Sequence, residues 1–191
     1  IPRLEKEGME ADDVLGSIAR QAVEKGLGVK IYTGDRDLLQ LVNDRVIVNL
    51  PGRSMADARD YRAEDVVQKM GVRPDQVIDL KALMGDSSDN IPGVPGVGEK
   101  TAISLLTEYG TLDAIYEHIE DIAPRFRKKL EEGKASAYMS KKLATICTDV
   151  DIVLELEKAS NSHLEFGAVE KIFQELEFRT LIGRLRDLKA K

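Results

Sequence analysis

Residues 83–101 read LMGDSSDNIPGVPGVGEKT, and this stretch constrains the fold more than any other part of the chain. Two aspartates, Asp86 and Asp89, run directly into a turn with glycines at positions 93, 96 and 98, and a helical pattern follows over residues 99–109. A short glycine turn at a helix N-terminus aims backbone N–H groups outward, where they can receive a phosphate. Because another helical pattern precedes it at residues 74–84, the stretch predicts a helix-hairpin-helix arrangement that holds nucleic acid.

The turn and the first helical turn after it contain the residues best placed to hold a phosphodiester. They are Gly93, Gly96, Val97, Gly98, Lys100 and Thr101. Such backbone contacts grip a strand without reading its sequence. Glycine-rich turns also occur as plain connections, so the turn alone leaves both interpretations open. A basic stretch at residues 125–129, followed by Lys134, Lys141 and Lys142, either extends this grip along a duplex or forms a solvated helix face.

Working outward from this stretch, acidic side chains fall into three tight clusters. The seven carboxylates are Glu10, Asp12, Asp13, Asp35, Asp37, Asp86 and Asp89. Each cluster alone is compatible with helix capping or a polar turn. Carboxylates brought into one pocket repel each other, so a shared site is held together mainly by hard divalent cations. Three clusters beside a phosphate-binding turn therefore favour a metal centre, with all seven as candidate catalytic and metal-binding residues.

The chemistry expected of this set is phosphodiester hydrolysis. Ligands that are oxygen only point to Mg²⁺ or Mn²⁺ rather than zinc. Two such ions about 4 Å apart would polarise the phosphate, activate a water and stabilise the leaving oxygen. No general-base side chain is then required.

Patterning places the first clusters in an α/β region. Residues 11–24 carry apolar side chains at helical spacing, residues 29–33 and 46–50 are β-rich, and residues 36–42 are typical of a helix. The carboxylates at positions 35 and 37 thus follow the carboxyl end of a strand, where open parallel sheets place their ligand sites. Residues 51–54, PGRS, predict a turn after the second strand.

Beyond residue 60 the pattern becomes almost entirely helical. Helices are predicted at residues 63–70, 74–84, 99–109, 112–119, 123–130 and 134–146, with a returning edge strand at 151–156 and two closing helices within 166–188. We therefore expect two domains. Residues 1–60 form the C-terminal part of an α/β metal-site (resolvase-like) domain, and residues 61–191 form a helical helix-hairpin-helix subdomain that binds DNA.

Composition is that of a globular protein. Hydrophobic residues make up 42% of 191, and no run approaches the roughly 20 apolar residues that a membrane span needs. The net charge of −6 becomes +1 once the seven clustered carboxylates are set aside, so global charge does not argue against nucleic acid. A single cysteine, Cys147, excludes an internal disulfide framework and indicates a reducing, cytoplasmic compartment.

At these motifs the chain resembles the 5′-nuclease domain of bacterial DNA polymerase I, within the flap endonuclease and 5′-exonuclease superfamily. The resemblance rests on residues 8–14, 33–41 and 83–102, in the family's order, and continues through 138–151 and 176–179. It implies a Rossmann-like (PIN-like) parallel sheet with a two-metal site, here incomplete, followed by the helix-hairpin-helix subdomain. Glu10, Asp12 and Asp13 would serve chiefly the first metal, and Asp35, Asp37, Asp86 and Asp89 the second. A K⁺ ion on hairpin carbonyls is a further implication.

The resemblance also implies a function. It is that of a divalent-metal-dependent 5′-3′ exonuclease and structure-specific flap endonuclease in DNA replication and repair. Its partners would be 5′ flaps and nicked or gapped duplex, with polymerase and proofreading domains downstream, no membrane, and a cytoplasmic, nucleoid-associated location. Family members begin with a further segment that holds the first strands, two more metal-site aspartates and a basic helical arch. Because the chain starts at Ile1 without that segment, we expect poor cleavage by the isolated chain. A DNA-binding module without cleavage and a stand-alone 5′-exonuclease paralogue are the alternatives.

Overall fold

The computed structural model describes residues 2–52, 57–160 and 164–189. The chain divides into two compact units, which we describe separately: residues 5–153, and residues 1–4 together with 154–191. The predicted turn at residues 51–54 lies partly outside the described residues.

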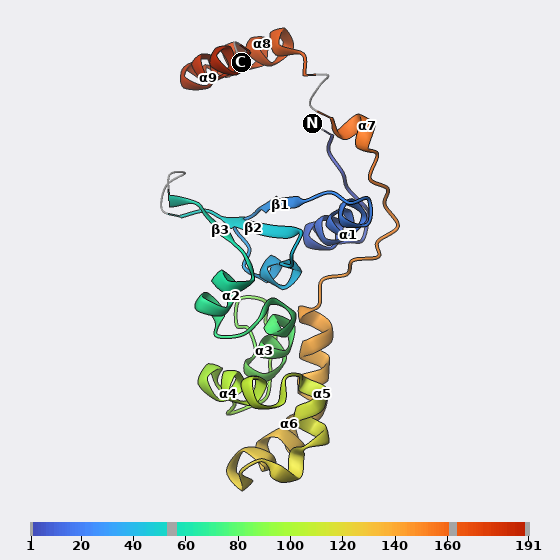
Figure 1. The fold of residues 1–191 in the computed structure, drawn as a ribbon, viewed down its shortest axis with the longest axis vertical. Helices are drawn as coiled ribbons and strands as arrows, with labels where there is room; N and C mark the ends of the chain where they lie inside the picture. Colours follow the sequence, from blue (N-terminus) through green and yellow to red (C-terminus); the bar gives the residue numbers. More distant parts are fainter. Residues whose placement is uncertain (1, 53–56, 161–163, 190–191) are drawn as a thin grey trace. The chain divides into compact units, whose positions relative to one another are not determined.

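A small sheet begins the larger unit. Its strands are β1 (Val29–Tyr32), β2 (Val46–Leu50) and β3 (Arg59–Tyr61), in that order; β1 and β2 are parallel, and β3 is antiparallel to β2. The parallel α/β pair predicted from the sequence is confirmed. The strand β3 was not predicted, because its three residues lack an apolar alternation. Helix α1 (Ala11–Glu24) lies beside β1 (Figure 1).

The rest of this unit is helical and is built around α3 (Val77–Met84). Around it lie α2 (Ala63–Met70), α4 (Glu99–Tyr109), α5 (Leu112–Glu117), α6 (Pro124–Ala144) and the short 3-10 helices η1 (Asp37–Leu41), η3 (Pro74–Gln76) and η4 (Ile119–Asp121). The side chains of Val77, Leu80 and Leu83 are fully buried, and α4 and α6 both pack on α3. A helix buried on most sides must supply partners for its charged side chains, which on α3 are Asp79 and Lys81.

Residues 124–144 form one continuous helix, so the prediction of two helices at 123–130 and 134–146 was wrong. The sequence suggested a break at Gly133, but this glycine lies inside α6 where the helix approaches the hairpin. A Cβ at Gly133 would meet Cγ1 of Val94 at 2.7 Å. The glycine is thus explained by a close tertiary contact.

The predicted edge strand at residues 151–156 was also wrong. The segment is irregular and leads into a short helix, α7 (Leu156–Ala159). Its backbone is held by side chains instead of a neighbouring strand, since Gln21 Nε2 donates to the carbonyl of Ile152 at 2.7 Å. Val153, which a strand would bury, is 67% exposed.

The smaller unit contains the two closing helices that the sequence predicted, α8 (Phe166–Glu175) and α9 (Arg179–Lys189). The turn between them includes Glu177 at a φ of 55° and brings the rings of Phe173 and Phe178 to 6.1 Å. Arg186 pairs with Glu170 across the two helices at 2.6 Å. Among the described helices, none is long and apolar enough to cross a membrane.

Replacing Gly133 with alanine tests the contact between α6 and the hairpin. Alanine is normally favoured over glycine in a helix by about 1 kcal/mol. Here the added methyl lies too close to the buried Val94, and overpacking of this kind costs about 1–3 kcal/mol. We expect Gly133→Ala to lower the free energy of unfolding by about 1 kcal/mol net in urea titrations. Gly183→Ala in α9, where an added Cβ meets nothing within 4 Å, is the control and should not destabilise. Equal effects of the two changes would contradict the packing argument.

Candidate metal centre

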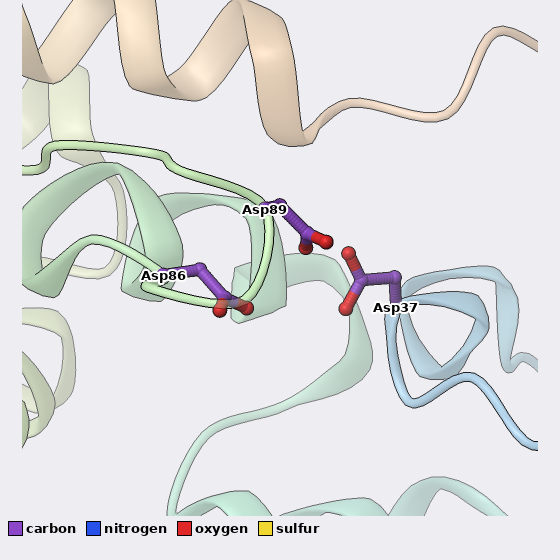
Figure 2. Close-up of side chains that lie close together, drawn as sticks. All are labelled: Asp37, Asp86 and Asp89. Carbon is purple, nitrogen blue, oxygen red and sulfur yellow. The ribbon is translucent and has the colours of Figure 1, made fainter.

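Three of the predicted carboxylates converge at one place (Figure 2). Asp37, Asp86 and Asp89 each offer an oxygen atom, and these atoms lie within 4.8 Å of one another. Asp37 begins η1, where its N–H donates to Asp35 Oδ1 at 2.9 Å. The other two lie in the loop after α3, which is closed by paired backbone hydrogen bonds between Asp86 and Ile91 at 2.9 and 2.8 Å. Local turns therefore present three carboxylates from two separate parts of the chain to one point.

A buried lysine, Lys81 on α3, occupies the centre of this group. Its side chain is only 5% exposed, and its Nζ lies 2.7 Å from Asp86 and 3.4 Å from Asp89 and donates to Asp37. The sequence analysis did not assign Lys81 a role. A signal was present, because Lys81 and Asp79 are the two charged residues in a mostly apolar helix, and a buried charge of that kind requires paired partners.

The lysine sets the ionisation of its neighbours. Burial disfavours the charged form of Asp86, but hydrogen bonds from Lys81 and Ser88 outweigh that and lower its pKa to about 2. Burial raises the pKa of Asp37 despite the Lys81 contact. The pKa of Lys81 itself is raised, since its hydrogen bonds to carboxylates exceed the effect of burial. The three carboxylates thus already share one cation, the ammonium of Lys81.

The first acidic cluster lies against the second. A cavity of about 590 Å³ is lined by residues of both clusters together with the end of α6, including Glu10, Asp12, Asp13, Asp35, Asp37 and Asp89. Burial raises the pKa of Asp12, and the charges of Asp35 and Asp37 raise it further. An adjoining cavity of about 620 Å³ is lined by Asp35, Asp37, Lys81, Asp86 and Asp89 among others. All seven predicted carboxylates therefore border these two cavities.

A segment after α6, residues 145–152, fixes the position of α1 beside the cavities. Asp13 Oδ1 accepts the N–H of Cys147 at 2.8 Å, and Ser17 Oγ accepts the N–H of Val150 at 3.0 Å. Gln40 binds the backbone where this segment leaves α6, donating to the carbonyl of Ala144 and accepting from the N–H of Ile146, each at 3.0 Å. This tether segment joins the element that carries the first cluster to η1, which carries part of the second. One carboxylate oxygen of Asp13 is thus already used in a hydrogen bond that supports the fold.

Next to the carboxylates lies the hairpin that the sequence predicted. Some of its residues bind other parts of the chain, and others leave their N–H groups free of any described partner. Gly93 is used internally, since its N–H donates to Ser140 Oγ at 3.0 Å and its carbonyl accepts from Ser136 Oγ at 2.6 Å. The side chain of Val97 is buried. In the described part of the chain, the N–H groups of Gly98 and Lys100 donate to no protein atom. The outward donors therefore lie at the start of α4, where an anion would meet them.

The residues present fit hard divalent cations. Every converging donor is a carboxylate oxygen, the type that Mg²⁺ and Mn²⁺ prefer. The ammonium of Lys81 marks a place where a positive charge is already stabilised by three carboxylates. The same three side chains would hold a metal ion, with Asp35 and the first cluster facing the neighbouring cavity.

Two family models match the chain in succession. One, described as "5'-3' exonuclease, N-terminal resolvase-like domain", matches residues 1–71. The other, described as "5'-3' exonuclease, C-terminal SAM fold", matches residues 72–166. The chain belongs to the 5′-3′ exonuclease family. The family expected from the acidic clusters and the hairpin, and the α/β class with a helical second part, are thereby confirmed.

Curated relatives are DNA polymerases. The chain is 44% identical to DNA polymerase I of Bacillus subtilis over 191 residues and 48% identical to that of Chloroflexus aurantiacus over 193 aligned positions, each covering 100% of this chain. It spans only 22% and 20% of the length of those two proteins. The similarity is thus to one portion of a much longer polymerase.

Solved structures of bacteriophage T5 proteins share this exonuclease fold. One is T5 5′-exonuclease with bound divalent zinc ions, with a TM-score of 0.67 at 27% identity over 78% of this chain and 54% of that one. Another is the T5 D15 flap endonuclease in a complex with DNA and metal ions, with a TM-score of 0.68 at 26% identity and the same coverage. Both of these T5 proteins are metal-bound nucleases of this fold.

Removal of the Lys81 ammonium should make the fold depend on divalent ions. Lys81→Met leaves three carboxylates facing one another without a cation, and loss of one partner of a buried pair costs roughly 3 kcal/mol. We expect that loss in the presence of EDTA, and a larger rise of Tm on Mg²⁺ addition than the unaltered protein shows. Lys30→Met, which removes a surface pair with Asp60, is the control and should change little. A Lys81→Met protein as stable as the parent in EDTA would refute this account.

Replacing Asp12 should change stability in the opposite direction from replacing Lys81. Because its folded-state pKa is raised, the ionised carboxylate near neutral pH opposes folding. Asp12→Asn should therefore raise Tm in EDTA near neutral pH and reduce the gain from Mg²⁺. The difference should vanish below about pH 4, where the carboxyl is protonated in both states. Asp44→Asn, at an exposed turn position, serves as the control. Destabilisation by Asp12→Asn in EDTA would exclude carboxylate repulsion at this position.

Proposed function

We propose that this chain is the 5′-3′ exonuclease and flap endonuclease domain of a DNA polymerase I, hydrolysing phosphodiesters at 5′ ends and flaps in replication and repair. The observation that supports it most is the convergence of Asp37, Asp86 and Asp89 at the start of the loop that leads into the hairpin. A hydrolytic centre at this position would lie within one short loop of the proposed phosphate-binding turn. The T5 structures with metal ions and DNA support the same assignment.

The proposed ligands follow the two cavities. Glu10, Asp12 and Asp13 would serve chiefly one Mg²⁺ or Mn²⁺ ion, with Asp13 also fastening the tether segment. Asp35, Asp37, Asp86 and Asp89 would serve a second. Bound ions of this kind polarise a phosphate and lower the pKa of a water. The contribution of the chain is to hold the carboxylates in place and to orient the strand.

DNA contact is proposed at the hairpin. A backbone phosphate would meet Gly96, Gly98, Lys100 and Thr101. Gly93 and Val97 would support the turn from inside. We also propose a K⁺ ion on the hairpin carbonyls. The substrates would be 5′ flaps and nicked or gapped duplex. Polymerase and proofreading domains downstream and a cytoplasmic, nucleoid-associated location complete the proposal. We also propose that the chain divides between residues 60 and 61 into a metal-site domain and a DNA-binding subdomain.

One observation favours a second function. Lys81 already neutralises the three converging carboxylates. A site with an internal cation could be inert, in which case the chain would serve only to bind DNA through its hairpin.

Cleavage of a labelled 5′-flap substrate with Mg²⁺ distinguishes the two functions. The assay is run on this chain and on the longest natural protein that contains it. Asp86→Asn and Asp37→Asn should each lower cleavage at least about 100-fold, since loss of even an outer-shell partner of a metal costs 10–100-fold. DNA affinity in EDTA should be retained, and Asp44→Asn should cleave normally. If no Mg²⁺-dependent cleavage occurs in either protein while DNA binding persists, the DNA-binding function replaces the nuclease.

A further inference from the structure

Helix α6 is strongly basic in a chain whose net charge is −6. Over residues 124–144 it carries seven basic side chains and two acidic ones. The sequence leaves two interpretations of this helix open: a solvated face, or a track for DNA. The structure decides between them residue by residue, because it shows which of the seven charges already have partners.

Four of the seven make an ion pair or a hydrogen bond within the chain. Their partners are an acidic side chain for three and a carbonyl for one: Arg127 with Glu120 at 2.5 Å, Lys128 with Glu132 at 3.9 Å, Lys141 with Asp79 at 2.9 Å, and Lys129 with the carbonyl of Gly96 at 2.8 Å. Three of these contacts hold α6 to η4, α3 and the hairpin, and the Lys128–Glu132 pair lies within α6. Their charges are therefore largely used in structure.

Three make no ion pair or hydrogen bond with the described residues, and one of them, Lys134, lies over the ring of Tyr116 at 5.1 Å. The other two, Arg125 and Lys142, stand at opposite ends of the helix and each lines a cavity, whereas Lys134 lines neither of those two cavities. Arg125 lies with its guanidinium 4.5 Å from the centre of the Phe126 ring, which leaves its N–H donors unused by any described residue. Lys142 forms no ion pair or hydrogen bond with the described part of the chain. Both side chains belong to exposed residues. An exposed cation is often only solvated, so a role for Arg125 and Lys142 depends on what surrounds them.

Those surroundings are the two places where DNA is expected. Arg125 borders a cavity of about 350 Å³ together with Lys100, Thr101 and Ser104, of which the first two belong to the proposed hairpin grip. Lys142 borders the acidic cavity of about 590 Å³ with Asp12 and Asp35. An ammonium beside so many carboxylates, yet paired with none of them, is available to an incoming phosphate. The two positions are 17 residues apart, or about 25 Å along a helix axis.

We propose that Arg125 and Lys142 contact the phosphate backbone of the bound DNA, Arg125 beside the hairpin and Lys142 at the entrance to the metal centre. The five basic residues between them make no phosphate contact in this proposal. This inference rests on the proposed function, because it takes DNA as the ligand. It assigns α6 the role of fixing how far the gripped backbone lies from the hydrolytic centre.

The test is the salt dependence of DNA binding. A nicked duplex with a short fluorescent 5′ flap is titrated with the full chain in EDTA, which prevents cleavage, at a series of KCl concentrations. Each phosphate contact contributes about −0.9 to the slope of log affinity against log salt. Arg125→Gln and Lys142→Gln should each reduce the magnitude of the slope by about 1, and the double variant by about 2. Arg125→Lys, which keeps the charge, should retain the slope.

Lys128→Gln is the matched control, since it removes an exposed positive charge from the same helix that is already paired with Glu132. Its slope should equal that of the unaltered chain. A loss for Lys128→Gln as large as for the other two would show a general charge effect and overturn the inference, as would unchanged slopes for both Arg125→Gln and Lys142→Gln. Thermal unfolding should be unaffected in all three variants, and a lowered Tm for Arg125→Gln and Lys142→Gln would indicate a structural role instead. If the unaltered chain shows no salt-dependent binding, it is the proposed function that fails.

Discussion

The buried ammonium of Lys81 is the interaction on which the metal centre depends. It stands on the most enclosed helix of the larger unit, and carboxylates from η1 and from the loop after α3 meet on it. Three carboxylates whose oxygens lie within 4.8 Å would repel one another strongly without a cation between them. The positive charge of Lys81 therefore helps to hold the loop that leads into the hairpin close to η1. Binding of a divalent ion then has to be understood as exchange or sharing with an internal cation, and not as the filling of an unsatisfied pocket.

Helix α6 connects this centre to the hairpin through hydrogen bonds and close packing. Ser136 and Ser140 hold the backbone of Gly93, Gly133 permits close contact with Val94, and the end of the helix leads into the tether segment on α1. One rigid element thus fixes the hairpin, the second acidic cluster and, through the tether segment, the first. A hydrolytic enzyme gains from such rigidity, because holding the reacting phosphate at a set distance from the catalytic groups removes entropy from the barrier.

Sequence patterns predicted the features that depend on local signals. Apolar spacing predicted α1, α8 and α9, and the glycine turn with its acidic flank predicted the hairpin and the convergence of Asp37 with Asp86. The misses depend on contacts between distant segments. The sequence suggests a helix break at Gly133, and only the fold shows that this glycine allows close contact with Val94. Residues 151–156 have the pattern of a strand, but a side chain of α1 binds their backbone where a neighbouring strand was expected. Lys81 was overlooked because only the fold shows that three carboxylates surround it.

If the proposed function holds, the distribution of charge would couple the binding of metal to the binding of nucleic acid. At about 0.1 M salt, exposed charges separated by more than about 10 Å are largely screened, so a net charge of −6 does not prevent DNA from approaching the hairpin. The acidic cavity is a different case, since a phosphate entering it would meet several carboxylates at short range, and Lys142 is the one basic residue among its described lining residues. Ions bound to those carboxylates would remove that repulsion. By linkage, any strengthening of DNA binding by the metal requires an equal strengthening of metal binding by DNA. On the proposed function, the hairpin would therefore engage a backbone first and independently, while entry of the scissile phosphate and occupancy of the metal site would depend on each other.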